Sequence, residues 1–199
     1  MQDAKNRMRD AEWRVFCAVD LTEPARVHLL EHIQRLRSLL PQVQASWSRE
    51  TNIHLTLKFV GEISRELVPA FSDAVSCAVT NLAPFSVVLE GAGVFPKRRD
   101  PRVLWIGISD PEGKLAELHS RLEGESAKAG FSREARPFHP HLTLARLRSQ
   151  RFASGVVQAH QQSVFEPQAF TVAELLVIRS ELTNAGSRYT VLSRHPLQK

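Results

Sequence analysis

The sequence predicts an α+β fold in which two similar antiparallel lobes share a central cleft. Short strand-like runs and amphipathic helical segments follow one another in the order β-α-β-β-α-β-β-α-β-α-β-β, and its consecutive strands favour antiparallel pairing. The tetrapeptide His-Leu-Thr-Leu occurs twice, at residues 54–57 and 141–144, which indicates an internal repeat. No low-complexity linker divides residues 13–199, so we expect one bilobal domain there.

The chain begins with a polar segment, a strand and a helix. Residues 1–12 are polar and charged, and we predict a flexible N-terminal extension. Residues 13–19 are rich in β-branched and aromatic side chains and predict a strand. Pro24 gives a start signal for a helix over 25–40, whose apolar residues recur at helical spacing until Pro41 stops it.

The remaining elements are predicted from the same periodicities. We expect helices at 64–82, 115–129 and 152–162, and strands at 43–47, 53–60, 85–89, 103–108, 141–147, 170–180 and 188–193. Gly61 is expected to end the strand before it. The glycine-rich and then charged residues 91–100 are expected to form a loop, and residues 184–186 a turn between the last two strands.

The repeated tetrapeptide predicts a site as well as a fold. Because side chains alternate between the two faces of a strand, the histidine and threonine of each copy share one face and the leucines share the other. Each strand can therefore bury its leucines and present an imidazole and a hydroxyl to a cleft. A single His-x-Thr is most often a satisfied polar pair on a half-buried strand. Two copies favour a catalytic site built from His54, Thr56, His141 and Thr143.

These side chains suit the chemistry of a phosphodiester. A histidine titrates near neutral pH, so one imidazole can accept a proton from water while the other donates one to the leaving oxygen. The threonine hydroxyls can donate hydrogen bonds to the phosphoryl oxygens. This scheme uses no metal and no cofactor, and the sequence shows no Asp/Glu cluster, Cys/His tetrad or phosphate-binding glycine loop. The residues alone leave open which histidine is the acid.

The paired motif and its flanks at 14–20, 47–61, 91–105 and 136–146 resemble the 2H phosphoesterases. Within that superfamily they resemble the bacterial and archaeal RNA 2',3'-cyclic phosphodiesterases, also named 2'-5' RNA ligases. The resemblance covers the chain from Trp13 onward. It implies a bilobal fold with outer helices, and hydrolysis of RNA 2',3'-cyclic phosphate ends to 2'-phosphomonoesters, with reversible 2'-5' RNA ligation as a further activity.

The resemblance also implies roles for single residues. It suggests His54 as the proton donor and His141 as the proton acceptor, with Thr56, Thr143 and Arg146 binding the substrate. By strict alternation Arg146 should face away from His141, so it can reach the phosphate only if the strand contains a bulge. Lys58 has the parity to face the cleft beyond Thr56.

The charge and the apolar content of the chain indicate which partners it can bind. The net charge is +5, and arginine supplies 20 of the 26 positive residues. Guanidinium groups suit phosphate, which favours RNA with a 2',3'-cyclic phosphate end as partner; tRNA fragments are one candidate. No apolar run is long enough for a membrane span, and the N-terminus lacks the apolar segment of a signal peptide. We expect a cytoplasmic monomer that uses no metal, cofactor or membrane.

Other functions stay open at this point. A 2H enzyme could act on a small cyclic nucleotide or an ADP-ribose derivative. The chain could instead be a non-catalytic RNA-binding module whose histidines are structural, or hold a metal through histidines. His28 and His32 lie four residues apart, a spacing that suits a metal, but they lack a Glu-x-x-His context and are expected to form a surface pair.

Overall fold

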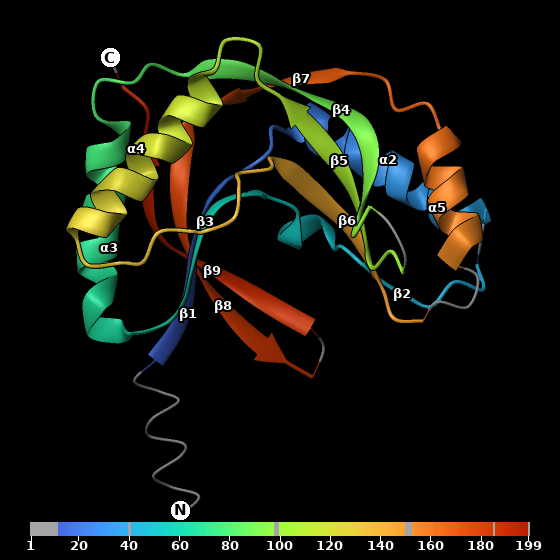
Figure 1. Cartoon of the computed structure of the whole chain (residues 1–199), viewed down its shortest axis with the longest axis horizontal. Helices are drawn as coiled ribbons and strands as arrows, with labels where there is room; N and C mark the ends of the chain where they lie inside the picture. The colour runs from blue at the N-terminus through green and yellow to red at the C-terminus, as the bar shows by residue number, and fades with distance from the viewer. Residues whose placement is uncertain (1–11, 40, 98–99, 150–152, 185, 199) are drawn as a thin grey trace, which may run out of the picture.

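Two antiparallel sheets form the centre of the computed structural model, which describes residues 12–39, 41–97, 100–149, 153–184 and 186–198 (Figure 1). The first sheet has the order β3 (Leu55–Ser64), β1 (Glu12–Val19), β8 (Glu174–Thr183), β9 (Gly186–Pro196). The second has the order β2 (Ala45–Trp47), β6 (His141–Leu147), β5 (Val103–Ser109), β4 (Phe85–Phe95), β7 (Gln168–Val172). The predicted α+β class is confirmed, and each sheet contains one motif strand, β3 or β6.

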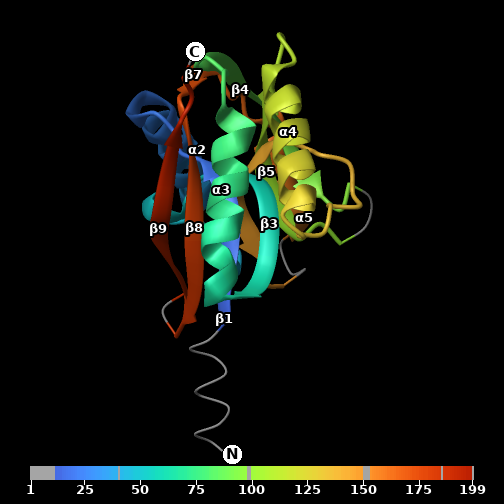
Figure 2. The same cartoon turned by 90° about the vertical axis from the view of Figure 1, so that its left-hand side faces the viewer.

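Helices flank the two sheets. Helices α3 (Val68–Val79) and α4 (Lys114–Lys128) lie side by side against the first sheet, where α3 contacts β8 and β9 and α4 contacts β3 (Figure 2). Helices α2 (Glu23–Leu39) and α5 (Ala153–Gln162) contact β7 and β4 of the second sheet. Two short 3-10 helices, η1 (Glu50–Asn52) and η2 (Arg65–Leu67), precede β3 and α3. No helix in the described ranges is long and apolar enough to cross a membrane.

The leucines of both motifs lie in the hydrophobic core, as the alternation predicts. Leu55 and Leu57 on β3, and Leu142 and Leu144 on β6, are all almost fully buried in one continuous cluster. Burying a leucine side chain contributes about 1.5–3 kcal/mol. The core therefore holds each motif strand with its histidine and threonine on the opposite face.

The first sheet is assembled from both ends of the chain, which corrects one predicted element. The expected strand over 170–180 is two strands: β7 ends at Val172 and pairs with β4, and β8 begins at Glu174 and pairs with β1. The chain thus passes from the second sheet to the first at Ala173. Both parts are apolar, so the run resembles one strand although its two halves have different partners.

Two glycines expected to end or interrupt strands lie within them instead. Gly61 adopts a φ of +91°, and β3 continues through it to Ser64 with Val60 as an extra residue opposite β1. Gly91 adopts a φ of +75° at a bulge in β4, which continues to Phe95, so residues 91–95 are strand and not loop. Glycine accepts this backbone conformation without the Cβ clash of other residues, so the ladder resumes after each bulge.

Some predictions reach beyond the described residues. The predicted N-terminal extension over 1–12 lies outside them except for Glu12, which begins β1. Leu40, Phe152 and Ala185, at the edges of two predicted helices and within a predicted turn, also lie outside.

Candidate active site

A cleft of about 1220 Å³ lies between the two motif strands and is lined by residues of both sheets. All five predicted site residues line it: His54, Thr56, His141, Thr143 and Arg146. His54 directly precedes β3, and His141 is the first residue of β6. The structure therefore brings together two segments that lie 87 positions apart in the sequence.

Arg146 reaches the cleft because β6 contains the bulge that the alternation requires. On β5, the neighbours Trp105 and Leu104 pair with Thr143 and Ala145 of β6. Leu144 therefore has no partner on β5 and is the extra residue of the bulge. Leu144 and Ala145 are both buried. The faces are thereby exchanged after the motif, and Arg146 returns to the side of Thr143.

A matching bulge in β3 turns Lys58 away from the cleft. Ala18 on β1 pairs with Thr56 and Cys17 with Lys58, which leaves Leu57 as the extra residue. The prediction that Lys58 faces the cleft is wrong, because the side chain is buried on the core side. The position that returns to the cleft face is Phe59.

The buried Lys58 forms a network behind β3. Its Nζ donates to Glu123 Oε1 on α4 at 2.7 Å and to the carbonyl oxygen of Ser132 at 2.9 Å. Glu123 Oε2 accepts from the backbone N–H of Glu134 at 3.1 Å. This network ties the first motif strand to the segment that leads into the second.

His141 is held in one tautomer. Its Nδ1 lies 2.6 Å from the carbonyl oxygen of His139. Because a carbonyl only accepts hydrogen bonds, Nδ1 carries the hydrogen, and in the neutral ring Nε2 is then an acceptor. Burial lowers the pKa of His141, although its hydrogen bond to the His139 backbone opposes that shift. At neutral pH the free protein therefore presents an unprotonated Nε2.

His54 lies in an aromatic setting formed by strands far away in the sequence. Its ring stacks on Phe16 of β1, with centroids 4.7 Å apart and planes 26° from parallel, and meets the edge of Tyr189 of β9 at 5.2 Å. Burial lowers the pKa of His54 to about 4, while the charge of Asp20 and a hydrogen bond with the Asn52 backbone oppose this. Phe16 is buried. Nothing in the sequence pointed to Tyr189.

Arg26, also missed from the sequence, braces the segment before His54. This residue of α2 donates from Nη1 to the carbonyl oxygen of Glu50 at 2.7 Å, and its Nη2 pairs with Asp20. The side chain is only 12% exposed. A guanidinium with several donors can bind a carboxylate and a backbone carbonyl at the same time, and helical periodicity in the sequence does not reveal such a role.

Ser48 holds the second motif in place through two hydrogen bonds to its backbone. Its hydroxyl donates to the carbonyl oxygen of Thr143 at 2.6 Å, and its backbone N–H donates to the carbonyl oxygen of Leu144 at 2.8 Å. The segment between β2 and β3 thus contacts one motif and runs directly into the other.

Comparison with known proteins identifies the family. A family model described as the 2'-5' RNA ligase superfamily matches residues 25–184. The chain belongs to this superfamily. The predicted resemblance to the 2H phosphoesterases is confirmed, and the chain is an enzyme of this type.

Curated relatives match this superfamily member over most of its length. The RNA 2',3'-cyclic phosphodiesterase of Methanothermobacter thermautotrophicus is 35% identical over 89% of the chain and 95% of the relative. The protein of the same name from Escherichia coli is 29% identical over 92% of the chain and 96% of the relative.

Solved structures of similar proteins have the same fold over nearly the whole chain. TT0787 of Thermus thermophilus is 29% identical, with a TM-score of 0.75, over 92% of the chain and 97% of that structure. E. coli LigT complexed with 3'-AMP is 30% identical, with a TM-score of 0.70, over 94% of the chain and 99% of that structure.

The cleft of this superfamily member is electropositive. Its lining includes five arginines from β1, α2, β6 and the segments that follow β2 and β6: Arg14, Arg37, Arg49, Arg146 and Arg148. Glu50 is the acidic residue among the described residues that line it. Clustered positive charge in a cleft attracts polyanions and raises their local concentration.

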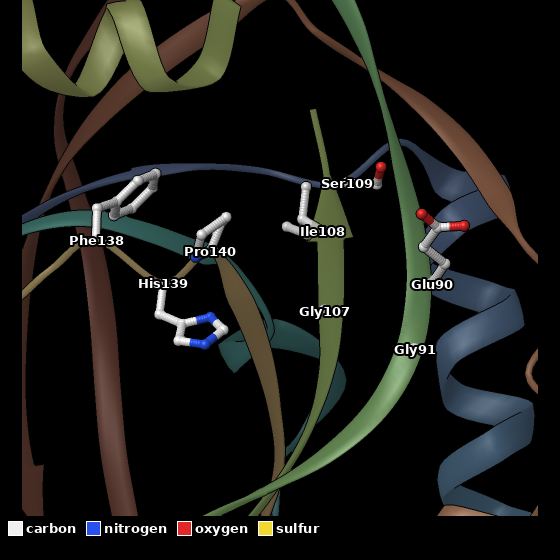
Figure 3. Close-up of a pocket in the computed structure, with 8 residues that line it drawn as sticks. All are labelled: Glu90, Gly91, Gly107, Ile108, Ser109, Phe138, His139 and Pro140. Carbon is white, nitrogen blue, oxygen red and sulfur yellow. The ribbon is translucent and has the colours of Figure 1, made fainter. Parts of the chain in front are cut away.

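A second hollow of about 680 Å³ is lined by none of the five predicted residues. It is bounded by β4, β5 and the segment that leads into β6, and Figure 3 shows Phe138, His139 and Pro140 of that segment across from Glu90. His139 is exposed there, and its backbone carbonyl orients His141.

The histidines of α2 do not form the predicted surface pair. His32 is buried, and its Nε2 lies 3.2 Å from Nδ1 of His160 on α5, which packs over this part of α2. His28 contacts the carbonyl oxygen of Glu166 instead. Across the described ranges, no three His, Cys, Asp or Glu side chains are grouped so that they could hold a metal ion.

Proposed function

We propose that this enzyme hydrolyses 2',3'-cyclic phosphate ends of RNA to 2'-phosphomonoesters, using two histidines and no metal or cofactor. The observation that carries the proposal is the pair His54 and His141, which face one cleft from opposite sheets, each with a threonine beside it. Relatives named RNA 2',3'-cyclic phosphodiesterase support the substrate class.

In the proposed reaction, His141 is the base. Its Nε2 takes a proton from water as the water oxygen bonds to phosphorus, and the bond from phosphorus to O3' breaks. His54 donates a proton to O3', which leaves a free 3'-hydroxyl and a 2'-phosphate. The tautomer of His141 supports this order, because its Nδ1 hydrogen is already committed to the His139 carbonyl.

The remaining residues bind the phosphate in this proposal. The hydroxyls of Thr56 and Thr143 donate hydrogen bonds to the non-bridging oxygens as charge develops there. Arg146 pairs with the same oxygens through its planar fork of donors. If a ribose 5'-hydroxyl attacks in place of water, the same bond changes yield a 2'-5' linkage, the ligation for which the superfamily is named.

An oligonucleotide fits the cleft better than a small cyclic nucleotide. A cyclic nucleotide carries one phosphate, whereas five arginines are spread along a cleft of about 1220 Å³. Several separated guanidinium groups match several phosphates along a chain. This favours RNA over a small cyclic nucleotide as the proposed substrate.

The experiment that tests this function is product analysis on an oligonucleotide ending in a 2',3'-cyclic phosphate, in excess EDTA. We expect complete conversion to the 2'-phosphate. Loss of activity in chelator with recovery on adding a divalent metal would refute the mechanism. A 3'-phosphate product would retain the two histidines but reverse the ribose in the cleft.

The pH dependence follows from the lowered histidine pKa values. Activity needs one imidazole neutral and the other protonated, so kcat/KM should be bell-shaped, with apparent pKa values that belong to the pair. Because burial lowers both pKa values, that of His54 to about 4, the optimum of kcat/KM should lie below the usual histidine pKa of about 6.5. The bound phosphate anion favours protonated imidazoles, so the kcat profile should shift to higher pH. A kcat/KM that is flat across the acidic and neutral range would contradict the assignment.

Arg146 should act on substrate binding. Arg146→Ala should lower kcat/KM by roughly 10- to 100-fold, since hydrogen bonds to charged groups contribute about 1.5–3 kcal/mol. Arg146→Lys should rescue only part of this, because an ammonium cannot reproduce the bidentate fork. Arg121→Ala, on outer helix α4, is the control and should leave kcat/KM unchanged. Equal kinetics of Arg146→Ala and wild type would show that Arg146 does not touch substrate.

A further inference from the structure

Two aromatic side chains of the second sheet lie against the ring of His141. The ring of Phe95, the last residue of β4, has its centroid 5.1 Å from that of His141, with the two planes at 84°. The indole of Trp105 on β5 lies 6.1 Å from His141, at 59°. Phe95 and Trp105 also contact each other, with centroids 5.0 Å apart. These two residues therefore form a continuous aromatic wall beside the imidazole.

The aromatic wall contacts both residues of the hydrogen bond that sets the tautomer of His141. Each of its two rings lies 5.7 Å from the ring of His139, whose carbonyl oxygen is 2.6 Å from Nδ1 of His141. The hydrogen bond holds one edge of the imidazole, and the wall occupies the space beside it. A side chain held by both packing and a hydrogen bond is restricted to one rotamer.

The position of the indole depends on a glycine in the neighbouring strand. Gly93 on β4 pairs directly with Trp105, and a Cβ added at position 93 would overlap the indole ring. The backbone of Gly93 does not adopt the positive φ that often requires glycine. The glycine is therefore explained by the close approach of the indole, whose residue is only 9% exposed.

His160 of α5 links the two strands that carry the aromatic wall. Its Nε2 lies 3.2 Å from the carbonyl oxygen of Gly93 and 3.0 Å from that of Trp105. Because carbonyls only accept hydrogen bonds, Nε2 carries the hydrogen and shares it between the two strands. His160 is fully buried, so water does not compete for this bond. It holds β4 and β5 together at the level of the indole.

We propose that Phe95 and Trp105 are positioning residues for the base of the reaction, which hold the imidazole of His141 so that Nε2 faces the attacking water. This rests on the proposed function. Neither residue lines the cleft, so neither is placed to touch the substrate. Their effect on the rate therefore passes through the orientation of His141. Misplacing a reacting group by about 1 Å can lower a rate by about 100-fold.

The test begins with Phe95→Leu, which keeps an apolar side chain at the partly buried position and removes the ring. For hydrolysis of the cyclic-phosphate oligonucleotide, kcat should fall roughly 10- to 100-fold. KM should be unchanged, because the threonines and the arginine that bind the phosphate are untouched. Trp105→Phe keeps an aromatic ring opposite Gly93 and should lose less of kcat than Trp105→Leu does.

A second background shows whether the aromatic wall acts through His141. When the imidazole is already absent, in His141→Ala, adding Phe95→Leu should leave the residual single-turnover rate unchanged, since there is no ring to orient. A residue that serves only the fold would lower the rate in both backgrounds. Equal losses from Phe95→Leu with and without His141 would therefore overturn the proposal.

Phe85→Leu is the matched control. Phe85 lies at the other end of β4, where it is buried in the hydrophobic core and pairs with β7. The same substitution there should lower stability but change neither kcat nor KM at a temperature where the variant stays folded. An unchanged kcat in Phe95→Leu, or an equal loss in Phe85→Leu, would overturn the positioning role while wild-type hydrolysis stands. Absence of hydrolysis by the wild type itself would refute the proposed function and the positioning role with it.

Discussion

His54→Ala and His141→Ala are each expected to lower kcat by about 100-fold or more, the usual contribution of a general acid or base. Each variant removes a proton-transfer group from the cleft and leaves the buried leucines of its strand in place. Both variants should therefore remain folded. Single-turnover hydrolysis of the cyclic-phosphate oligonucleotide measures the rate, and far-UV circular dichroism checks the fold.

The double variant distinguishes a cooperating pair from two independent residues. If the histidines act on one proton-transfer sequence, His54→Ala/His141→Ala should cost much less than the product of the single losses. His28→Ala is the control, because His28 lies on α2 outside the cleft lining. Near wild-type turnover in either single variant would rule out the two-histidine mechanism.

Glu123→Ala is expected to lower the free energy of unfolding by about 3–5 kcal/mol, the cost of leaving a buried charge without its partner. The side chains of Lys58 and Glu123 are only 2% and 8% exposed, and their charged atoms lie 2.7 Å apart. Without the carboxylate, the Lys58 ammonium keeps the Ser132 carbonyl but loses its counter-charge. Urea unfolding, followed by circular dichroism, measures the loss.

Two further variants show whether burial is the cause. Glu125→Ala removes another glutamate of α4 that pairs with a lysine at 2.7 Å, but Lys128 is 73% exposed, so the cost should stay below about 1 kcal/mol. Lys58→Met/Glu123→Leu removes both buried charges and should recover most of the stability that Glu123→Ala loses. Similar costs for Glu123→Ala and Glu125→Ala would contradict this account.

The sequence by itself determined the two motif strands and the faces of their first four residues. The two-residue period of a strand assigns His54 and Thr56 to one side and Leu55 and Leu57 to the other, whatever the strand pairs with. The same holds for the copy at 141–144. Because this repeat lies in the primary structure, the shared cleft and the superfamily were accessible before the fold was known, and the order of strand and helix patterns predicted the α+β class.

Only the tertiary structure decided which side chains after each motif return to the cleft. A bulge is a relation between two paired strands, so the sequence of one strand does not show that Lys58 turns into the core while Phe59 and Arg146 face the cleft. The division of 170–180 between two sheets was hidden for the same reason, since both halves are apolar and only their partners differ. Tyr189 reaches His54 because β9 closes the first sheet from the far end of the chain, a long-range contact for which local periodicity carries no signal.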